Sequence, residues 1–171
     1  IEQLKDPRRR EQAFTRLVRE YQEPIYWQIR RMVNSHDDAD DILQNTFLKA
    51  WTAIEAFRGE SKLSTWLFRI ATNETLNHLN KEKSTQSIDD VSNTGIQLQS
   101  DTYFDGDETQ IQFQQALSTL PPKQRAVFDM KYFQEMKYEE ISQIMGTSIG
   151  ALKASYHHAV KKITEYFERL H

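Results

Sequence analysis

Apolar residues recur along most of the chain at intervals of three and four, which is the period of an amphipathic helix. In the N-terminal half the pattern covers about residues 14–33, 38–54 and 63–79, and in the C-terminal third about 117–133, 138–145 and 149–167. The chain holds only 5 glycines and 4 prolines, so few turns are available and a β-rich fold is disfavoured. The pattern predicts an all-α fold.

The helical pattern is interrupted at three points in the N-terminal half. Pro24 predicts a kink or break before Ile25, because proline cannot donate the helical hydrogen bond. Residues 57–62 form a polar loop, after which Ser61 or Ser64 can cap the next helix. The apolar period then lapses over residues 72–75, which predicts a second break before Leu76.

Charge and composition divide the chain in two. Residues 84–108 carry six acidic side chains and no basic one, are rich in Ser, Thr, Asp and Gln, and show no apolar period. We therefore expect two small helical domains, residues 1–83 and 109–171, joined by a flexible acidic linker over 84–108. The acidic residues of this linker are Asp89, Asp90, Asp101, Asp105, Asp107 and Glu108.

The C-terminal domain predicts a helix-turn-helix. A short amphipathic helix ends at Gly146, and a longer one follows with Ser148 as its expected N-cap. A plain helical hairpin would show the same period. The face opposite the apolar stripe favours DNA instead, because its small residues allow close approach to a groove and its donors can reach phosphates and base edges. That face comprises Gly150, Ala151, Ala154, Ser155, His158 and Lys161, with Lys153 and His157 on its flanks.

Two sequence motifs make the interpretation specific. MKYEEISQIMGTSIGALKASYHHAVKKI, in the C-terminal domain, resembles the promoter-reading helix-turn-helix of bacterial sigma factors. DADDILQNTFLKAW followed by FRGESKLSTWLFRIATNETLNHL is similar to the second conserved region of the extracytoplasmic-function (ECF) group of sigma factors. The two motifs occur in the family's order and span residues from about 10 to 168.

This resemblance implies that the helix over 38–54 binds the clamp helices of the largest RNA polymerase subunit. Asp41, Gln44 and Leu48 lie off the apolar stripe and can face a partner, whereas Phe47 lies on it. The acids at the start of this helix also offset the helix dipole, and both interpretations can hold together. The residues expected to bind polymerase are Asp41, Gln44, Phe47 and Leu48.

The resemblance also implies that residues 58–83 read the minus-ten promoter element as single-stranded DNA. Asn73 lies where the helical period lapses, and in the family a loop there holds a flipped base of the nontemplate strand. Amides can donate to and accept from base edges, and basic side chains position phosphates. Trp66 is expected in the core. The residues expected to contact this element are Arg58, Lys62, Arg69, Asn73, Asn77, Asn80 and Lys81.

For the minus-thirty-five element, the resemblance implies reading by the longer helix of the helix-turn-helix. The family often has several arginines there, and this chain has none, so bidentate reading of guanine by arginine is not available. We expect an unusual sequence preference and weak binding to free DNA. The residues expected at this interface are Ser148, Gly150, Ala151, Lys153, Ala154, His157, His158 and Lys161.

Other function classes fit less well. A LuxR-like regulator shares the terminal helix-turn-helix but needs an α/β receiver, and a helical protein-binding adaptor leaves the asparagines unexplained. His36-Asp37 matches the dipeptide of HD-type phosphohydrolases, yet no histidine precedes it to complete a metal site. The absence of cysteine excludes disulfides and thiolate metal sites, and no phosphate-binding glycine loop or nucleophile motif is present. We expect no catalytic residue, no cofactor and no metal.

The sequence therefore predicts an ECF-type sigma factor that is not an enzyme and acts in the cytoplasm. Its expected partners are core RNA polymerase and promoter DNA. An anti-sigma factor is a further expectation carried from the family alone. No apolar run is long enough to insert into a membrane.

Overall fold

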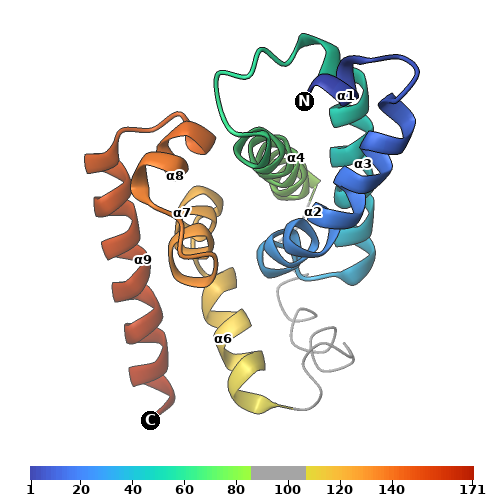
Figure 1. Cartoon of the computed structure of the whole chain (residues 1–171). Coiled ribbons are helices and arrows are strands. Elements are labelled where there is room, and N and C mark those ends of the chain that lie inside the picture. The colour runs from blue at the N-terminus through green and yellow to red at the C-terminus, as the bar shows by residue number, and fades with distance from the viewer. Residues whose placement is uncertain (86–106) are drawn as a thin grey trace.

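The computed structural model describes residues 1–85 and 107–171, and within these ranges it consists of helices joined by turns (Figure 1). The all-α prediction is confirmed. We call residues 1–85 the first module and 107–171 the second module. The first contains α1 (Glu2–Lys5), α2 (Arg10–Met32), α3 (His36–Ala53), the 3-10 turn η1 (Ile54–Ala56) and α4 (Leu63–Thr85). The second contains α6 (Glu108–Ser118), α7 (Pro122–Phe128), the π-helical turn η3 (Asp129–Phe133), α8 (Tyr138–Met145) and α9 (Ile149–Leu170).

In the first module, α2, α3 and α4 pack against one another around a shared apolar core. The apolar stripes predicted from the sequence face this core: Ile25, Ile29, Ile54 and Leu67 are completely buried. Trp66, expected in the core, is half-buried at its edge, where it packs on the buried Phe57 with ring centroids 5.1 Å apart. Within the described residues, no helix is both long and apolar enough to cross a membrane.

Helix α4 is continuous, so the predicted break over residues 72–75 is wrong. Thr72 and Thr75 are completely buried and carry the core-facing stripe through the interval where apolar residues are missing. Their hydroxyl groups have partners inside the protein: Thr75 donates to the carbonyl of Ala71, and Thr72 accepts from Gln28. A search for apolar residues alone misses such a stripe, because a satisfied threonine can replace an apolar side chain.

Two further predictions about helix ends need correction. Pro24 does not break its helix, since α2 runs through it. Helix α4 begins at Leu63, so Lys62 holds the preceding position and neither Ser61 nor Ser64 is its N-cap. Both ends of the predicted linker belong to helices in the structure. Helix α4 extends to Thr85, and Asp107 caps α6 by accepting a hydrogen bond from the amide of Thr109. The rest of the linker, residues 86–106, lies outside the described residues.

The second module contains the predicted helix-turn-helix. Gly146 ends α8 with a φ of 65°, in the left-handed region that glycine adopts easily. Ser148 then caps α9 by accepting a hydrogen bond from the amide of Ala151. Leu152 is buried as predicted, but Ile149 and Val160, assigned to the buried stripe, are 36% and 40% exposed. The buried stripe of α9 instead runs through Leu152, Ala159 and Ile163, and Val160, one residue after Ala159, lines the groove beside the helix.

The two modules pack against each other, and one cluster of buried apolar side chains continues from the first into the second. Helix α8 lies beside α4 (Figure 1). At the interface, Arg31 pairs with Asp129, which also accepts from Gln134 at 2.7 Å. Arg125 donates to the carbonyl of Arg31 at 2.9 Å.

Charges buried at this interface are expensive to dehydrate. Burial raises the pKa of Asp129, although the neighbouring Arg31 opposes the rise. Burial also lowers the pKa of Arg125 to about 9, against the opposing effect of Asp129. One terminal nitrogen of Arg125, Nη2, is buried without a hydrogen-bond partner. These groups therefore contribute less stability than their contacts suggest.

Candidate polymerase and promoter interfaces

One face of α3 forms an apolar groove with α2. The groove has a volume of about 370 Å³, and Gln44, Phe47 and Leu48 of the predicted polymerase site line it. Leu48 is 60% exposed and adds to the apolar surface that this groove leaves open to solvent. Asp41 is exposed on α3 but does not line the groove. The other lining residues are Phe14, Val18, Gln22, Asp40, Leu43 and Trp51.

A second groove lies on another side of α3, where this helix meets α4. Asn73, Asn77 and Asn80 all line it, so the fold brings together the three asparagines predicted to contact the minus-ten element. We call this the asparagine groove; its volume is about 680 Å³, and all three asparagines are exposed. Amide groups at the edge of such a groove can donate to and accept from an unpaired base. The remaining lining residues are Lys49, Thr52, Ala53, Ile70, Glu74, Leu76 and Lys123.

The basic residues predicted for the same DNA element lie elsewhere. Arg58 and Lys62 are exposed in the loop before α4, and Lys81 is exposed near the end of that helix. None of them lines the asparagine groove. Arg69 is turned toward the second module, where its guanidinium donates to the carbonyl of Gln143 at 2.9 and 2.6 Å. In this arrangement Arg69 does not share an edge with the asparagines.

The predicted minus-thirty-five face lies along α9 and is open to solvent. Leu152 and Ala159 anchor the opposite side of the helix in the core. The small residues at the start of α9 and the basic residues further along therefore share one accessible surface. Ser155 is half-buried. The exposed members of the predicted set are Ser148, Gly150, Ala151, Lys153, Ala154, His157, His158 and Lys161.

No sequence pattern indicates the charged residues of the asparagine groove. Lys49 on α3 pairs with Glu74 on α4, and Lys123 reaches the groove from the start of α7 in the second module. Both lysines lie far from the asparagines in sequence, so only the packing of helices places them there. The presence of Lys123 also means that the second module borders this groove in the packed arrangement.

The second module has an apolar groove of its own, formed between α9 and the segment from α6 to η3. Its volume is about 640 Å³. Tyr132 is 56% exposed here, and Phe113, Tyr156 and Phe167 supply further aromatic surface. Sequence analysis assigned these aromatics to no site. An exposed aromatic groove of this kind is available to a protein partner.

Comparison with known proteins defines the class. The Sigma-70 region 2 family model matches residues 17–85, and the Sigma-70 region 4 model matches residues 110–163. The chain therefore belongs to the sigma-70 family of sigma factors, which bind core RNA polymerase and direct it to promoters.

Its relatives place it in the ECF group. The chain is 34% identical over 156 residues to the ECF RNA polymerase sigma factor SigW of Bacillus subtilis, covering 85% of this chain and 83% of SigW. It is 29% identical over 174 residues to the RNA polymerase sigma-H factor of Pseudomonas aeruginosa, covering 92% and 88%. The family is one of transcription initiation factors, so the LuxR-like and adaptor alternatives are set aside.

Two solved structures share the fold. One is sigma factor RpoE in complex with the anti-sigma factor NepR from Bartonella quintana, with a TM-score of 0.70, 22% identity, and coverage of 91% of this chain and 97% of that one. The other is CnrH in complex with the cytosolic domain of CnrY, with a TM-score of 0.71, 20% identity, and coverage of 93% and 90%.

Proposed function

We propose that this ECF sigma factor divides its work among three surfaces. The groove between α2 and α3 binds core polymerase through Gln44, Phe47 and Leu48, with Asp41 beside it. The asparagine groove holds an unpaired base of the minus-ten element, and the exposed face of α9 reads the minus-thirty-five element. On this proposal, residues 1–83 and 109–171 act as separate domains joined by the acidic linker, and neither catalyses a reaction.

The observation that carries this proposal is the asparagine groove. Three amides, each exposed, converge on one recess large enough for a small ligand, and Lys49 lies at its edge. Extruding a base from a duplex costs a few kcal/mol, so a groove that binds the extruded base offsets part of the cost of opening DNA. A face that served only to keep the module in solution would not need three amides in one recess.

Reading both promoter elements at once requires the modules to separate. The names of the two elements put them about 25 base pairs apart, which is about 85 Å of duplex at about 3.4 Å per base pair, whereas a compact chain of this length has a radius of gyration of only about 16 Å. In the packed arrangement Arg69 is held by Gln143 and Lys123 borders the asparagine groove. Binding to core polymerase must therefore supply the free energy that separates the modules.

The test is transcription from a defined promoter by core polymerase with the purified chain. We expect transcription that depends on the chain and on both promoter elements. Asn73→Ala should lose activity on duplex promoter and regain much of it on a template with a pre-melted bubble, because the unpairing cost has been removed. If the variant opens duplex promoters as well as the parent does, Asn73 has no role in holding the base.

We also propose that an anti-sigma protein regulates the chain in the cytoplasm, where core polymerase and the chromosome are found. Two structures with this fold are described as complexes, RpoE with the anti-sigma factor NepR and CnrH with the cytosolic domain of CnrY. The chain has exposed apolar grooves that such a protein could cover. The test is to isolate, with a tagged form of the chain, the proteins of its host that bind it. An anti-sigma protein among them should compete with core polymerase for binding to the chain. A bound protein that does not compete would contradict the proposal.

A further inference from the structure

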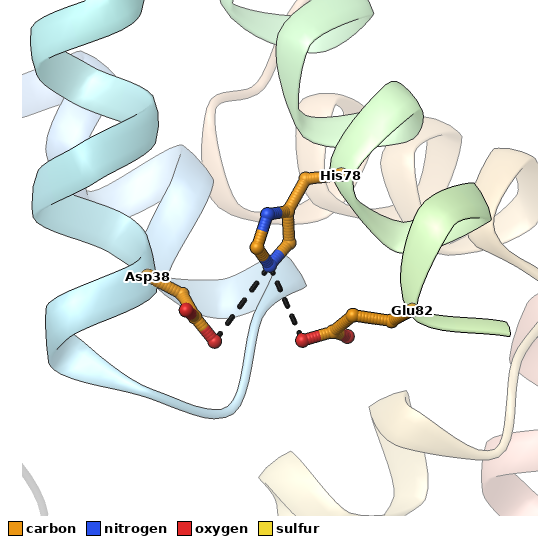
Figure 2. Close-up of side chains that lie close together, drawn as sticks. All are labelled: Asp38, His78 and Glu82. Atoms are coloured by element: carbon orange, nitrogen blue, oxygen red, sulfur yellow. Dashed lines mark hydrogen bonds and ion pairs between the residues drawn. The ribbon is translucent and has the colours of Figure 1, made fainter. Parts of the chain in front are cut away.

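Three side chains that the proposed function does not use come together where the start of α3 meets the last turns of α4. Figure 2 shows the Nε2 atom of His78 facing a carboxylate oxygen of Asp38 on one side and one of Glu82 on the other. The distances are 3.7 Å to Asp38 and 3.2 Å to Glu82. All three donor atoms lie within 4.8 Å of one another.

Local structure fixes all three positions. His78 and Glu82 are four residues apart on α4, so they lie on one face of that helix. Asp38 is in the first turn of α3, where its amide donates to the capping hydroxyl of Ser35. The side chains of His78, Asp38 and Glu82 are 29%, 35% and 40% exposed, so each is partly shielded while water and small ions can still reach it.

A single hydrogen on the imidazole nitrogen cannot satisfy both carboxylates of this cluster. The Nε2 atom of an imidazole carries at most one hydrogen, which Glu82 can accept at 3.2 Å, whereas the oxygen of Asp38, at 3.7 Å, is too far away for a hydrogen bond with it. A divalent cation among the three atoms would accept the nitrogen lone pair and balance both carboxylate charges. Metal–ligand bonds from nitrogen and oxygen to zinc are about 2.0–2.2 Å, which puts neighbouring ligand atoms of a tetrahedral site about 3.3–3.6 Å apart. The distances from Nε2 to the oxygens of Asp38 and Glu82, 3.7 and 3.2 Å, lie on either side of that range.

We propose that Asp38, His78 and Glu82 form a binding site for a first-row divalent metal ion, with Zn²⁺ the best match. One imidazole nitrogen and two carboxylate oxygens suit zinc, whereas magnesium and calcium favour sites made of oxygen alone. Three protein ligands leave room for water in the fourth position. The ion would tie the first turn of the proposed polymerase-binding helix to the end of the helix that carries the asparagines.

No sequence motif predicts this site. His78 is 40 residues from Asp38, and the acids at the start of α3 are sufficiently explained by the helix dipole. A second histidine–carboxylate pair, which has one potential metal ligand fewer, serves as a comparison. On α3 itself, His36 and Asp40 lie four residues apart with Nε2 and the carboxylate oxygen 3.1 Å apart, and that cluster has no third metal-ligand side chain among the described residues.

The test is calorimetric titration of the metal-free full-length chain with Zn²⁺, and separately with Mg²⁺. We expect one tight Zn²⁺ per chain, much weaker Mg²⁺ binding, and a rise in the thermal unfolding midpoint with Zn²⁺. His78→Ala and Glu82→Gln should each weaken Zn²⁺ binding at least about ten-fold. The matched controls His36→Ala and His157→Ala should bind Zn²⁺ as the parent does.

Cobalt gives an independent readout, because visible absorption of bound Co²⁺ reports its ligands. The parent chain and His36→Ala should share one spectrum, and Glu82→Gln should lose it. Glu82→Gln keeps the size of the side chain, so it remains informative if His78→Ala does not fold. Equal loss of Zn²⁺ binding in His36→Ala, a preference for Mg²⁺, or unchanged binding in Glu82→Gln would each overturn the proposal and leave an ordinary ion-pair cluster.

Discussion

The two grooves of the first module share helix α3 but differ in what surrounds them. The groove against α2 is lined only by first-module residues and keeps Leu48 exposed. The asparagine groove includes Lys123 of the second module. In the packed arrangement the first groove can meet polymerase directly, whereas the second shares its border with a module that must move before both promoter elements can be read. Under the proposed function, the difference predicts that polymerase binds first and that promoter opening follows.

The largest effect is expected from breaking the interface between the two modules, because this interface brings Lys123 to the asparagine groove. Asp129→Ala would leave Arg31 and Arg125 without their buried carboxylate, at a cost of about 3–5 kcal/mol. We expect the modules to separate while each keeps its helices. Because the chain has no cysteine, one dye can be placed in each module at Glu11→Cys and Arg169→Cys, and energy transfer between them should fall.

The control for that experiment is Glu139→Ala, which removes an exposed acid from α8 and should leave energy transfer unchanged. The separated Asp129→Ala variant should bind core polymerase at least as well as the parent. Unchanged energy transfer in Asp129→Ala would mean that the buried pair does not hold the modules together.

Next in size is the loss of a base contact in the asparagine groove. Asn73→Ala should cost about 1–3 kcal/mol in promoter opening, a fall of roughly ten-fold or more, with core binding nearly intact. Asn45→Ala is a matched control, because Asn45 is exposed on α3 but lines neither groove. Permanganate footprinting of unpaired thymines measures the opening. Weakened core binding in Asn73→Ala would contradict the division of work between the grooves.

A smaller effect is expected from the polymerase groove. Asp41→Ala combined with Gln44→Ala should weaken association with core polymerase by about 1–2 kcal/mol and lower transcription from every template, pre-melted or not. Phe47 is a poorer probe, since it is only 9% exposed and its truncation would also destabilise the core. Fluorescence anisotropy of the labelled chain with core polymerase measures the association. A defect confined to duplex templates would argue against this surface.

The smallest effect concerns a residue that lies in neither groove. Ser148→Ala removes the cap of α9 and should lower the free energy of unfolding by about 1 kcal/mol. Minus-thirty-five recognition should weaken, while core binding and base trapping should not change. Chemical denaturation and promoter footprinting measure the two effects. A loss of core binding equal to that of the Asp41 and Gln44 variant would show that the surfaces do not act separately.

Local sequence signals predicted much of this molecule. The Gly146 turn and the Ser148 cap depend on neighbouring residues and both are present, and the apolar stripes are present apart from Ile149 and Val160 of α9. The continuity of α4 was missed because Thr72 and Thr75 are polar by type yet buried in fact. Lys49 and Lys123 were missed as groove residues because only long-range packing places them there. The assignment of residues to polymerase and DNA stays a prediction.

Because α4 is continuous, the distances between residues along this helix are fixed. Asn73 and Thr85 lie on the same unbroken helix, 12 residues apart, which corresponds to about 18 Å at about 1.5 Å per residue. A hinge at residues 72–75 would have let the chain leave the base-binding site in many directions. Without that hinge, the last turns of α4 keep one orientation relative to Asn73, so under the proposed function a base held at Asn73 also sets the direction of the helix axis as far as Thr85.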